Sequence, residues 1–155
     1  MALKADRQID AVEIGYYLNE TASGGEIVSV STAASGADLD GITALATVSA
    51  TISGIRPIGM LMNAFVDIDQ TRYHRNFNKD QQVVGDKATI MTKGWAVTSF
   101  AIDATAGKKA YLETSGQIAT IAGNFTDTDD LINPIVGTFR SGLDENGYAR
   151  VYIDL

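Results

Sequence analysis

The stretch that decides the fold is IVGTFRSGLDENGYARVYIDL, residues 135–155. Its two ends, 135–140 and 148–155, are rich in β-branched and aromatic side chains, which fit the pleated surface of a sheet. Between them, Asn146-Gly147 is a strong signal for a tight turn, because both residue types tolerate a positive φ. The stretch therefore predicts two strands joined by a turn.

Upstream of this stretch, short apolar runs and glycine-containing turns recur. Four further strands are predicted here, namely Lys87–Met91, Trp95–Ile102, Lys109–Glu113 and Gln117–Ile121. They are separated by Lys93-Gly94, Ala106-Gly107, Ser115-Gly116 and the stretch 123–130. Strands at this spacing indicate a barrel or sandwich rather than βαβ units. The one helix that we expect is a short one around Asp127–Ile132.

The first half of the chain also shows the period of strands. Val12, Ile14, Tyr16 and Leu18 alternate with Glu13, Gly15, Tyr17 and Asn19, which predicts a strand with one buried face. The even positions of 42–52 are all Ile, Ala or Val, and the β-branched content favours a strand there over a helix. A further short strand is expected over Ile27–Ser31, and another apolar stretch runs from Met60 to Ile68.

The expected fold is all-β, a small β-barrel or sandwich with an extended N-terminal arm and little helix. Residues 85–155 should form a compact β-barrel, 21–84 a β-rich region that is a second subdomain or a protruding tip, and 1–20 the arm and first strand. Met1–Asp10 lacks the strand period, so we expect it to become ordered only against a partner. Its deletion should then leave a folded protein.

Composition limits the partners. The chain has 155 residues and a formal net charge of −7, so phosphate backbones and anionic membranes should repel it. It has no cysteine, which fits synthesis in a reducing cytoplasm. The first residues carry charges and the chain has no long apolar run, so we expect neither an export signal nor a membrane span.

The common catalytic and metal-binding patterns are missing from the sequence. The one histidine, His74, lies in a polar segment, and there is no Gly-x-Ser-x-Gly elbow or phosphate-binding loop. Asp127, Asp129 and Asp130 lack the spacing of an EF-hand and fit a turn or helix start better than a calcium site. We therefore expect no enzyme, no catalytic or metal-binding residue and no cofactor.

Two segments are candidates for contact with a partner. Residues 70–82, QTRYHRNFNKDQQ, combine cationic and aromatic side chains, the types enriched at interface anchors, although a solvated loop is the alternative. The N-terminal segment exposes apolar side chains unless a partner covers them. The candidate contact residues are Leu3, Ile9, Val12, Ile14, Tyr16, Arg72, Tyr73, His74, Arg75 and Phe77.

The C-terminal half resembles a known family. Gly107–Leu112, Ser115–Ala119, Ile135–Phe139 and Asp144–Ile153 are similar in order and in glycine placement to small β-barrel capsid-decoration (cement) proteins of tailed bacteriophages. The likeness covers residues 85–155 well and 1–84 loosely; 27–82 is longer than a minimal barrel of this kind needs.

The resemblance implies a non-enzymatic virion protein. Such a protein would be made in the host cytoplasm and would sit on the outer capsid surface. It would form a homotrimer that bridges subunits of the major capsid protein and stabilises the mature shell. The alternative is a glycan-binding or head-fibre-like β module, in which Trp95, Tyr111, Tyr148 and Tyr152 would form a stacking platform, although their alternation makes Trp95 and Tyr111 better candidates for the core.

Overall fold

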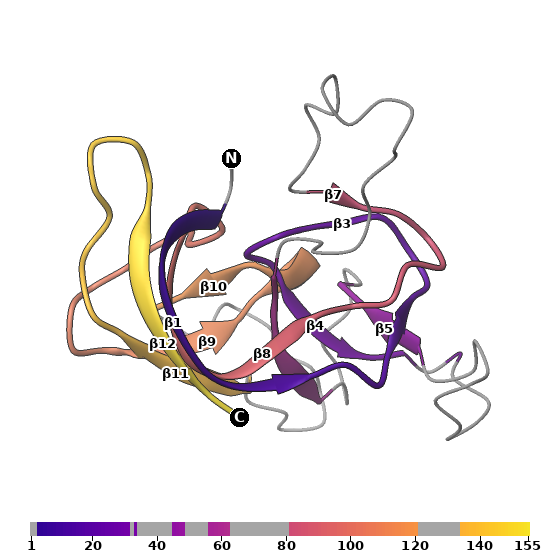
Figure 1. The fold of residues 1–155 in the computed structure, drawn as a ribbon. Helices are drawn as coiled ribbons and strands as arrows, with labels where there is room; N and C mark the ends of the chain where they lie inside the picture. The colour runs from indigo at the N-terminus through magenta and orange to yellow at the C-terminus, as the bar shows by residue number, and fades with distance from the viewer. Residues whose placement is uncertain (1–2, 32, 34–44, 49–55, 63–80, 121–133) are drawn as a thin grey trace, which may run out of the picture.

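The computed structural model describes residues 3–31, 33, 45–48, 56–62, 81–120 and 134–155, and within them the fold is all-β, as predicted (Figure 1). One mixed sheet holds ten strands in the order β10-β9-β11-β12-β8-β6-β4-β5-β2, with β1 paired on β8. The strands and the one turn of 3-10 helix, η1, are β1 Leu3–Glu13, β2 Tyr17–Leu18, β3 Ala22–Ser23, β4 Ile27–Val30, β5 Leu45–Thr47, β6 Pro57–Leu61, β7 Gln81–Gln82, β8 Ile90–Thr98, β9 Lys109–Leu112, η1 Thr114–Gly116, β10 Ile118–Ala119, β11 Ile135–Phe139 and β12 Ala149–Asp154. β3 and β7 form a separate ribbon. The helix predicted around Asp127–Ile132 lies outside the described residues.

Residues 135–155 form the predicted pair of strands, β11 and β12. β11 and β12 are antiparallel, with Phe139 opposite Val151 and Gly137 opposite Ile153. In the turn, a carboxylate oxygen of Asp144 accepts hydrogen bonds from the backbone N–H groups of Asn146 and Tyr148. Gly147 adopts the positive φ, 77°, that its place after Asn146 predicts.

The central strand is β8, and it corrects one prediction. Lys93-Gly94 was expected to be a turn between two strands, but both residues lie inside β8. Gly94 has a φ of 141°, and a Cβ there would overlap the carbonyl oxygen of Gln8 in β1. The glycine therefore lets β1 approach closely and β8 continue, rather than ending a strand.

Two buried clusters lie along the sheet. The larger one includes Phe139, Val151 and Ile153 from the C-terminal strands and also takes in Leu3 and Met60. The smaller one gathers around Leu18, Val28, Leu61 and Ile90. β8 contributes Met91 to the first and Ile90 to the second, so strands from 21–84 and 85–155 are neighbours in one sheet.

The N-terminal segment is extended, as predicted, but its partner is within the chain. β1 pairs antiparallel with β8 from Leu3, opposite Thr98, to Glu13, opposite Ile90. Leu3 is fully buried in the larger cluster, which supplies the apolar contacts that were expected from a partner. The prediction that residues 1–10 are ordered only against another molecule is therefore wrong for the described part of this segment.

The predicted buried face of residues 12–18 is only partly present. Leu18 is buried, but Val12 and Ile14 are 45% and 56% exposed. Irregularities in the pairing of β1 near Ile9 and Ala11 shift its register, and the strand ends at Glu13, whose side chain accepts a hydrogen bond from the N–H of Gly15. A one-residue shift turns a side chain to the other face of a sheet. The alternate residues of 12–18 therefore do not share one buried face, although their period in the sequence predicts it.

Candidate interaction surface

The outer face of β12 and its neighbours carries polar and aromatic side chains. Along β12, Val151 and Ile153 are buried, while Arg150, Tyr152 and Asp154 point to the other face. Pairing aligns Tyr152 with Trp95 of β8 and with Thr138 of β11. The same row continues to Lys109 of β9 on one side and to Gln8 of β1 on the other. One row of side chains thus crosses five strands.

Three cations lie over aromatic rings on this face. Lys4 Nζ is 4.2 Å from the centroid of the Tyr148 ring, and Arg150 Cζ is 4.6 Å from that of Trp95. Arg140 Cζ, just after β11, is 5.0 Å from the centroid of Tyr152. These distances lie within the range of cation–π attraction. We call Lys4, Trp95, Arg140, Tyr148, Arg150 and Tyr152 the cation–aromatic face.

Carboxylates neutralise the lysines at the margins of this face. Lys4 Nζ lies 3.8 Å from Asp144 Oδ2, and Lys93 Nζ lies 3.3 Å from Asp154 Oδ1. The hydrogen bond and charge of Asp154 raise the pKa of Lys93, and the backbone N–H of Tyr148 lowers the pKa of Asp144. In the part of the chain that the structure describes, no carboxylate pairs with Arg140 or Arg150.

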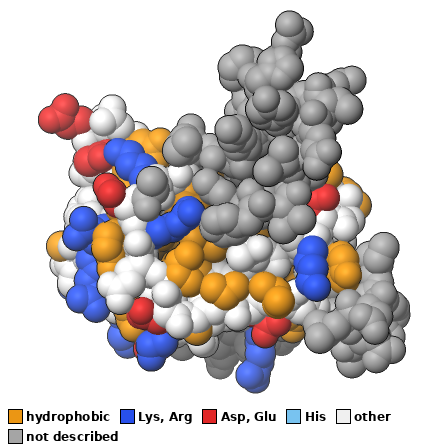
Figure 2. Space-filling model, viewed as in Figure 1, with side chains coloured by type: hydrophobic (Ala, Val, Ile, Leu, Met, Phe, Trp, Pro, Cys, Tyr) orange, Lys and Arg blue, Asp and Glu red, His pale blue; other side chains and the backbone are white. Residues whose placement is uncertain are grey.

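The space-filling view agrees with this distribution of charge. Figure 2 shows Lys and Arg side chains along the left edge of the molecule, with Asp and Glu side chains above them, and in Figure 1 this edge is formed by loops that flank β11 and β12. Both guanidinium-bearing residues are exposed, whereas the rings of Trp95 and Tyr152 are half-buried beneath them. Trp95 Nε1 also donates a hydrogen bond of 3.3 Å to Gln8 Oε1, which fixes the ring from the side of β1.

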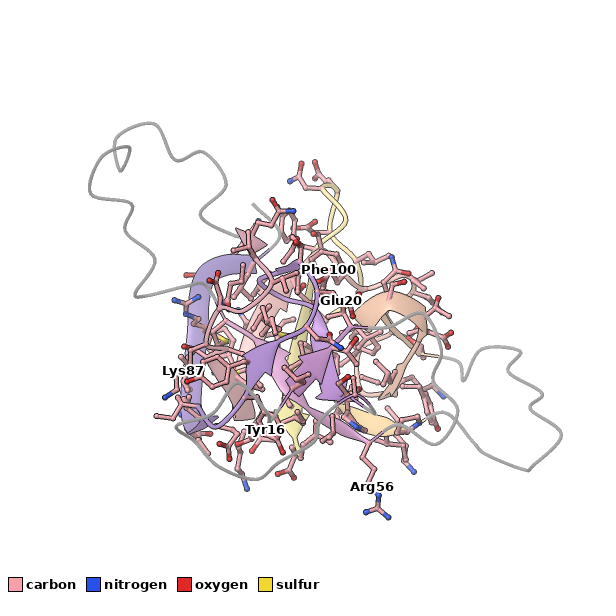
Figure 3. The ribbon with its side chains drawn as sticks, turned by 90° about the vertical axis from the view of Figure 1, so that its right-hand side faces the viewer. Tyr16, Glu20, Arg56, Lys87 and Phe100 are labelled. Carbon is pink, nitrogen blue, oxygen red and sulfur yellow. The ribbon has the colours of Figure 1, made fainter. Side chains whose placement is uncertain are left out.

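A second feature is the outer edge of β1. Among the described residues β8 is the one strand paired with β1, so the other backbone edge of this eleven-residue strand faces away from the sheet. Exposed apolar side chains, Val12 and Ile14, lie at its C-terminal end. The chain then turns back beside the segment that holds Lys87, because Tyr16 O accepts a hydrogen bond from the N–H of Ala88. Figure 3 shows Tyr16 and Lys87 at this end of the molecule.

The structure divides the predicted contact residues into three groups. Val12 and Ile14 are exposed and Tyr16 is half-buried, so they are available at the surface. Leu3 is fully buried, and Ile9 is packed against the same core, so Leu3 as a contact residue is corrected because its side chain fills the interior. Outside the described residues lie Arg72, Tyr73, His74, Arg75 and Phe77.

Sequence reasoning missed the two arginines of the cation–aromatic face. The alternation Arg150, Tyr152, Asp154 in the last strand was visible, but the residues that complete the face come from β1 and β8. Trp95 and Tyr111, expected in the core, are each half-buried. The sequence also offered Trp95, Tyr148 and Tyr152 as a platform on which sugars would stack. In the structure a cation lies over each of these three rings.

Two other kinds of site, a metal centre and a membrane-spanning helix, have no counterpart in the described ranges. No group of three or more His, Cys, Asp or Glu residues there is arranged to hold a metal ion. Nor does any helix within these ranges have the length and apolarity needed to cross a bilayer. A scan against protein-family models finds no match to the chain, and a search of curated proteins finds no relative with significant similarity.

Proposed function

We propose that this chain is a non-enzymatic structural protein that binds the outer surface of a tailed-phage capsid and bridges subunits of the major capsid protein. The segments that resemble decoration proteins form β9, β10, β11 and β12, which are consecutive neighbours in the sheet. The resemblance therefore corresponds to one continuous structural unit rather than to scattered strands.

The observation that carries the proposal is the outer edge of β1. A strand of the capsid subunit can pair with such an edge through backbone hydrogen bonds, and side-chain pockets then give specificity. Val12 and Ile14, exposed beside this edge, are the side chains that would enter those pockets. Irregular pairing along β1 and the charges of Asp6 and Asp10 disfavour unspecific pairing between copies of the protein.

Binding of this kind stabilises a shell without any chemistry. A protein that binds the mature lattice alone shifts the equilibrium toward it by about 2.7 kcal/mol per site at a hundredfold excess over the Kd. A homotrimer at three-fold positions would multiply this effect, since each copy holds adjacent subunits. The net charge of −7 keeps a densely displayed protein soluble.

The proposal expects a neighbouring reading frame to encode a major capsid protein, and the test is co-sedimentation with expanded and unexpanded capsids made from that protein. We expect binding to expanded capsids and its loss in Val12→Asp/Ile14→Asp. The matched control is Ile102→Asp/Leu143→Asp, which places acids at side chains of similar exposure, 55% and 43%, in loops that follow β8 and β11.

The outcomes test capsid binding and the role of the β1 edge separately. If the unmodified protein binds neither capsid form and instead binds sugars on a glycan array, the proposal is wrong and the glycan-binding alternative is favoured. If the protein binds expanded capsids but Val12→Asp/Ile14→Asp binds equally well, capsid binding stands and the edge of β1 is not the contact. Light scattering of the free protein and the symmetry of its density on the shell test the trimer.

A further inference from the structure

We propose that the cation–aromatic face docks on an acidic surface of the capsid protein, with Arg140 and Arg150 binding its carboxylates. This inference rests on the proposed function and names the chemistry of the partner. The face adjoins the outer edge of β1, because Lys4 and Gln8 belong to that strand. The edge and the face therefore form one continuous surface.

Basic residues are concentrated on this face. The chain has 19 acidic and 12 basic residues, yet the row and its margins hold five of the basic ones, namely Lys4, Lys93, Lys109, Arg140 and Arg150. Three carboxylates lie among them: Asp144 pairs with Lys4, Asp154 pairs with Lys93, and Asp10 accepts a hydrogen bond from Gln8. Within the described residues this face is thus a cationic region of an acidic protein, and it complements a partner of negative charge.

The geometry of the arginines also fits carboxylates. Each guanidinium lies over a ring that is itself held in the sheet, so it loses little freedom when it binds. Its N–H groups can form paired hydrogen bonds with a carboxylate, which are among the stronger contacts at interfaces. Arg, Trp and Tyr are also the residue types that dominate binding energy between proteins.

The same geometry disfavours two other kinds of partner. Single-stranded nucleic acids and sugars bind aromatic platforms by stacking on the ring faces. Arg150 and Arg140 already cover one face of Trp95 and of Tyr152, and both rings are half-buried. A protein surface with separate carboxylates needs only the guanidinium groups, and it fits this arrangement best.

Substitutions of arginine test the inference. Arg140→Gln/Arg150→Gln removes the two arginines of the face, and Arg150→Gln alone is matched by Arg56→Gln, which removes one exposed cation elsewhere. Figure 3 shows Arg56 and Tyr16 at separate places on the molecule. Arg150→Gln and Arg56→Gln change the net charge equally. Co-sedimentation with expanded capsids should be weakened roughly tenfold or more by the double substitution, and much less by Arg56→Gln than by Arg150→Gln.

Salt and fluorescence provide further readouts. Capsid binding should weaken as salt is raised, and this dependence should be smaller for Arg140→Gln/Arg150→Gln than for Arg56→Gln. The chain has one tryptophan, Trp95, and it lies on this face, so its emission should change when capsids bind. Arg140→Lys/Arg150→Lys keeps the charge but not the planar donors, and binding should be intermediate.

The outcomes distinguish this inference from the proposed function. No capsid binding by the unmodified protein contradicts the function itself. Capsid binding that is unaffected by Arg140→Gln/Arg150→Gln, with an unchanged salt dependence, overturns the inference and leaves the function standing. Alginate, a polyuronate, provides a second test. If Arg140→Gln/Arg150→Gln loses binding to alginate but still binds capsids, the inference is also overturned, because the face would then be a site for anionic sugars.

Discussion

Gly137 in β11 is the position where one methyl group should damage the fold most. Its backbone lies so close to β12 that a Cβ would overlap the carbonyl oxygen of Tyr152 and stand 2.8 Å from the carbonyl carbon and 3.1 Å from Ile153 Cα. Carbon atoms in favourable contact are about 3.5–4.0 Å apart. Because the obstructing atoms are backbone, Gly137→Ala must push the two strands apart.

The cost follows from what that separation disturbs. Overpacking a tightly packed interior costs about 1–3 kcal/mol. Each ladder hydrogen bond weakened between β11 and β12 adds roughly 1 kcal/mol. We therefore expect Gly137→Ala to lower the free energy of unfolding by about 3 kcal/mol or more, a large part of the 5–15 kcal/mol typical of small proteins.

Two other glycines serve as controls for this prediction. At Gly107 a Cβ would meet nothing within 4 Å, but the φ of 81° is strained for alanine, so Gly107→Ala should cost about 1–2 kcal/mol. At Gly142 the nearest atom would be Ala104 O at 3.6 Å, an ordinary contact, and Gly142→Ala should stay within about 0.5 kcal/mol. Urea unfolding followed by Trp95 fluorescence measures all three. If Gly137→Ala unfolds at the same urea concentration as Gly142→Ala, the close approach of the two strands is refuted.

Three further predictions concern the core and the ionisable groups. Phe139 is fully buried, so Phe139→Ala should cost about 3–5 kcal/mol and lower the Tm in calorimetry. Burial raises the pKa of Glu26, so the native state holds the proton of this carboxyl at a higher pH than the unfolded chain does. Stability should therefore fall as the pH rises from the pKa of the unfolded chain through the raised pKa of the native state. Glu26→Gln should remove this part of the pH dependence of urea unfolding. Backbone hydrogen bonds lower the pKa of Asp144, so its contribution to stability should be present above its ordinary pKa and be lost as the pH falls through the lowered value. Carboxyl NMR titration, compared with Asp144→Asn, tests this prediction.

Local sequence signals predicted the C-terminal strands well. The turn at Asn146-Gly147 and the alternation of β12 depend on residues close together in the chain, and both are present in the structure. Gly107 likewise forms the predicted turn, with a φ of 81°. Such features follow from backbone sterics and side-chain period, which a single stretch of sequence contains.

Features that depend on distant residues were not predicted. β1 pairs with β8 across about ninety positions, as the hydrogen bond from Trp95 to Gln8, 87 residues apart, illustrates. Without that pairing, nothing in residues 1–10 indicates that Leu3 is a core residue or that Gly94 makes room for a neighbouring strand. The cation–aromatic face was missed for the same reason, because Arg150 covers a ring from another strand and Lys4 a ring more than a hundred positions away.

The position of β1 also changes how its role must be tested. The sequence suggested that deleting residues 1–10 would leave a folded protein that no longer binds capsids. In the structure this deletion removes the fully buried Leu3 and most of the pairing with the central strand. Losing a buried leucine alone typically costs about 2–5 kcal/mol, so we expect the truncated protein to be unfolded or strongly destabilised. Circular dichroism and urea unfolding of the truncated chain check this expectation. A stable truncated fold would show that β1 belongs to the interface and contributes little to the core, whereas an unfolded one leaves Val12→Asp/Ile14→Asp as the variant that separates binding from folding.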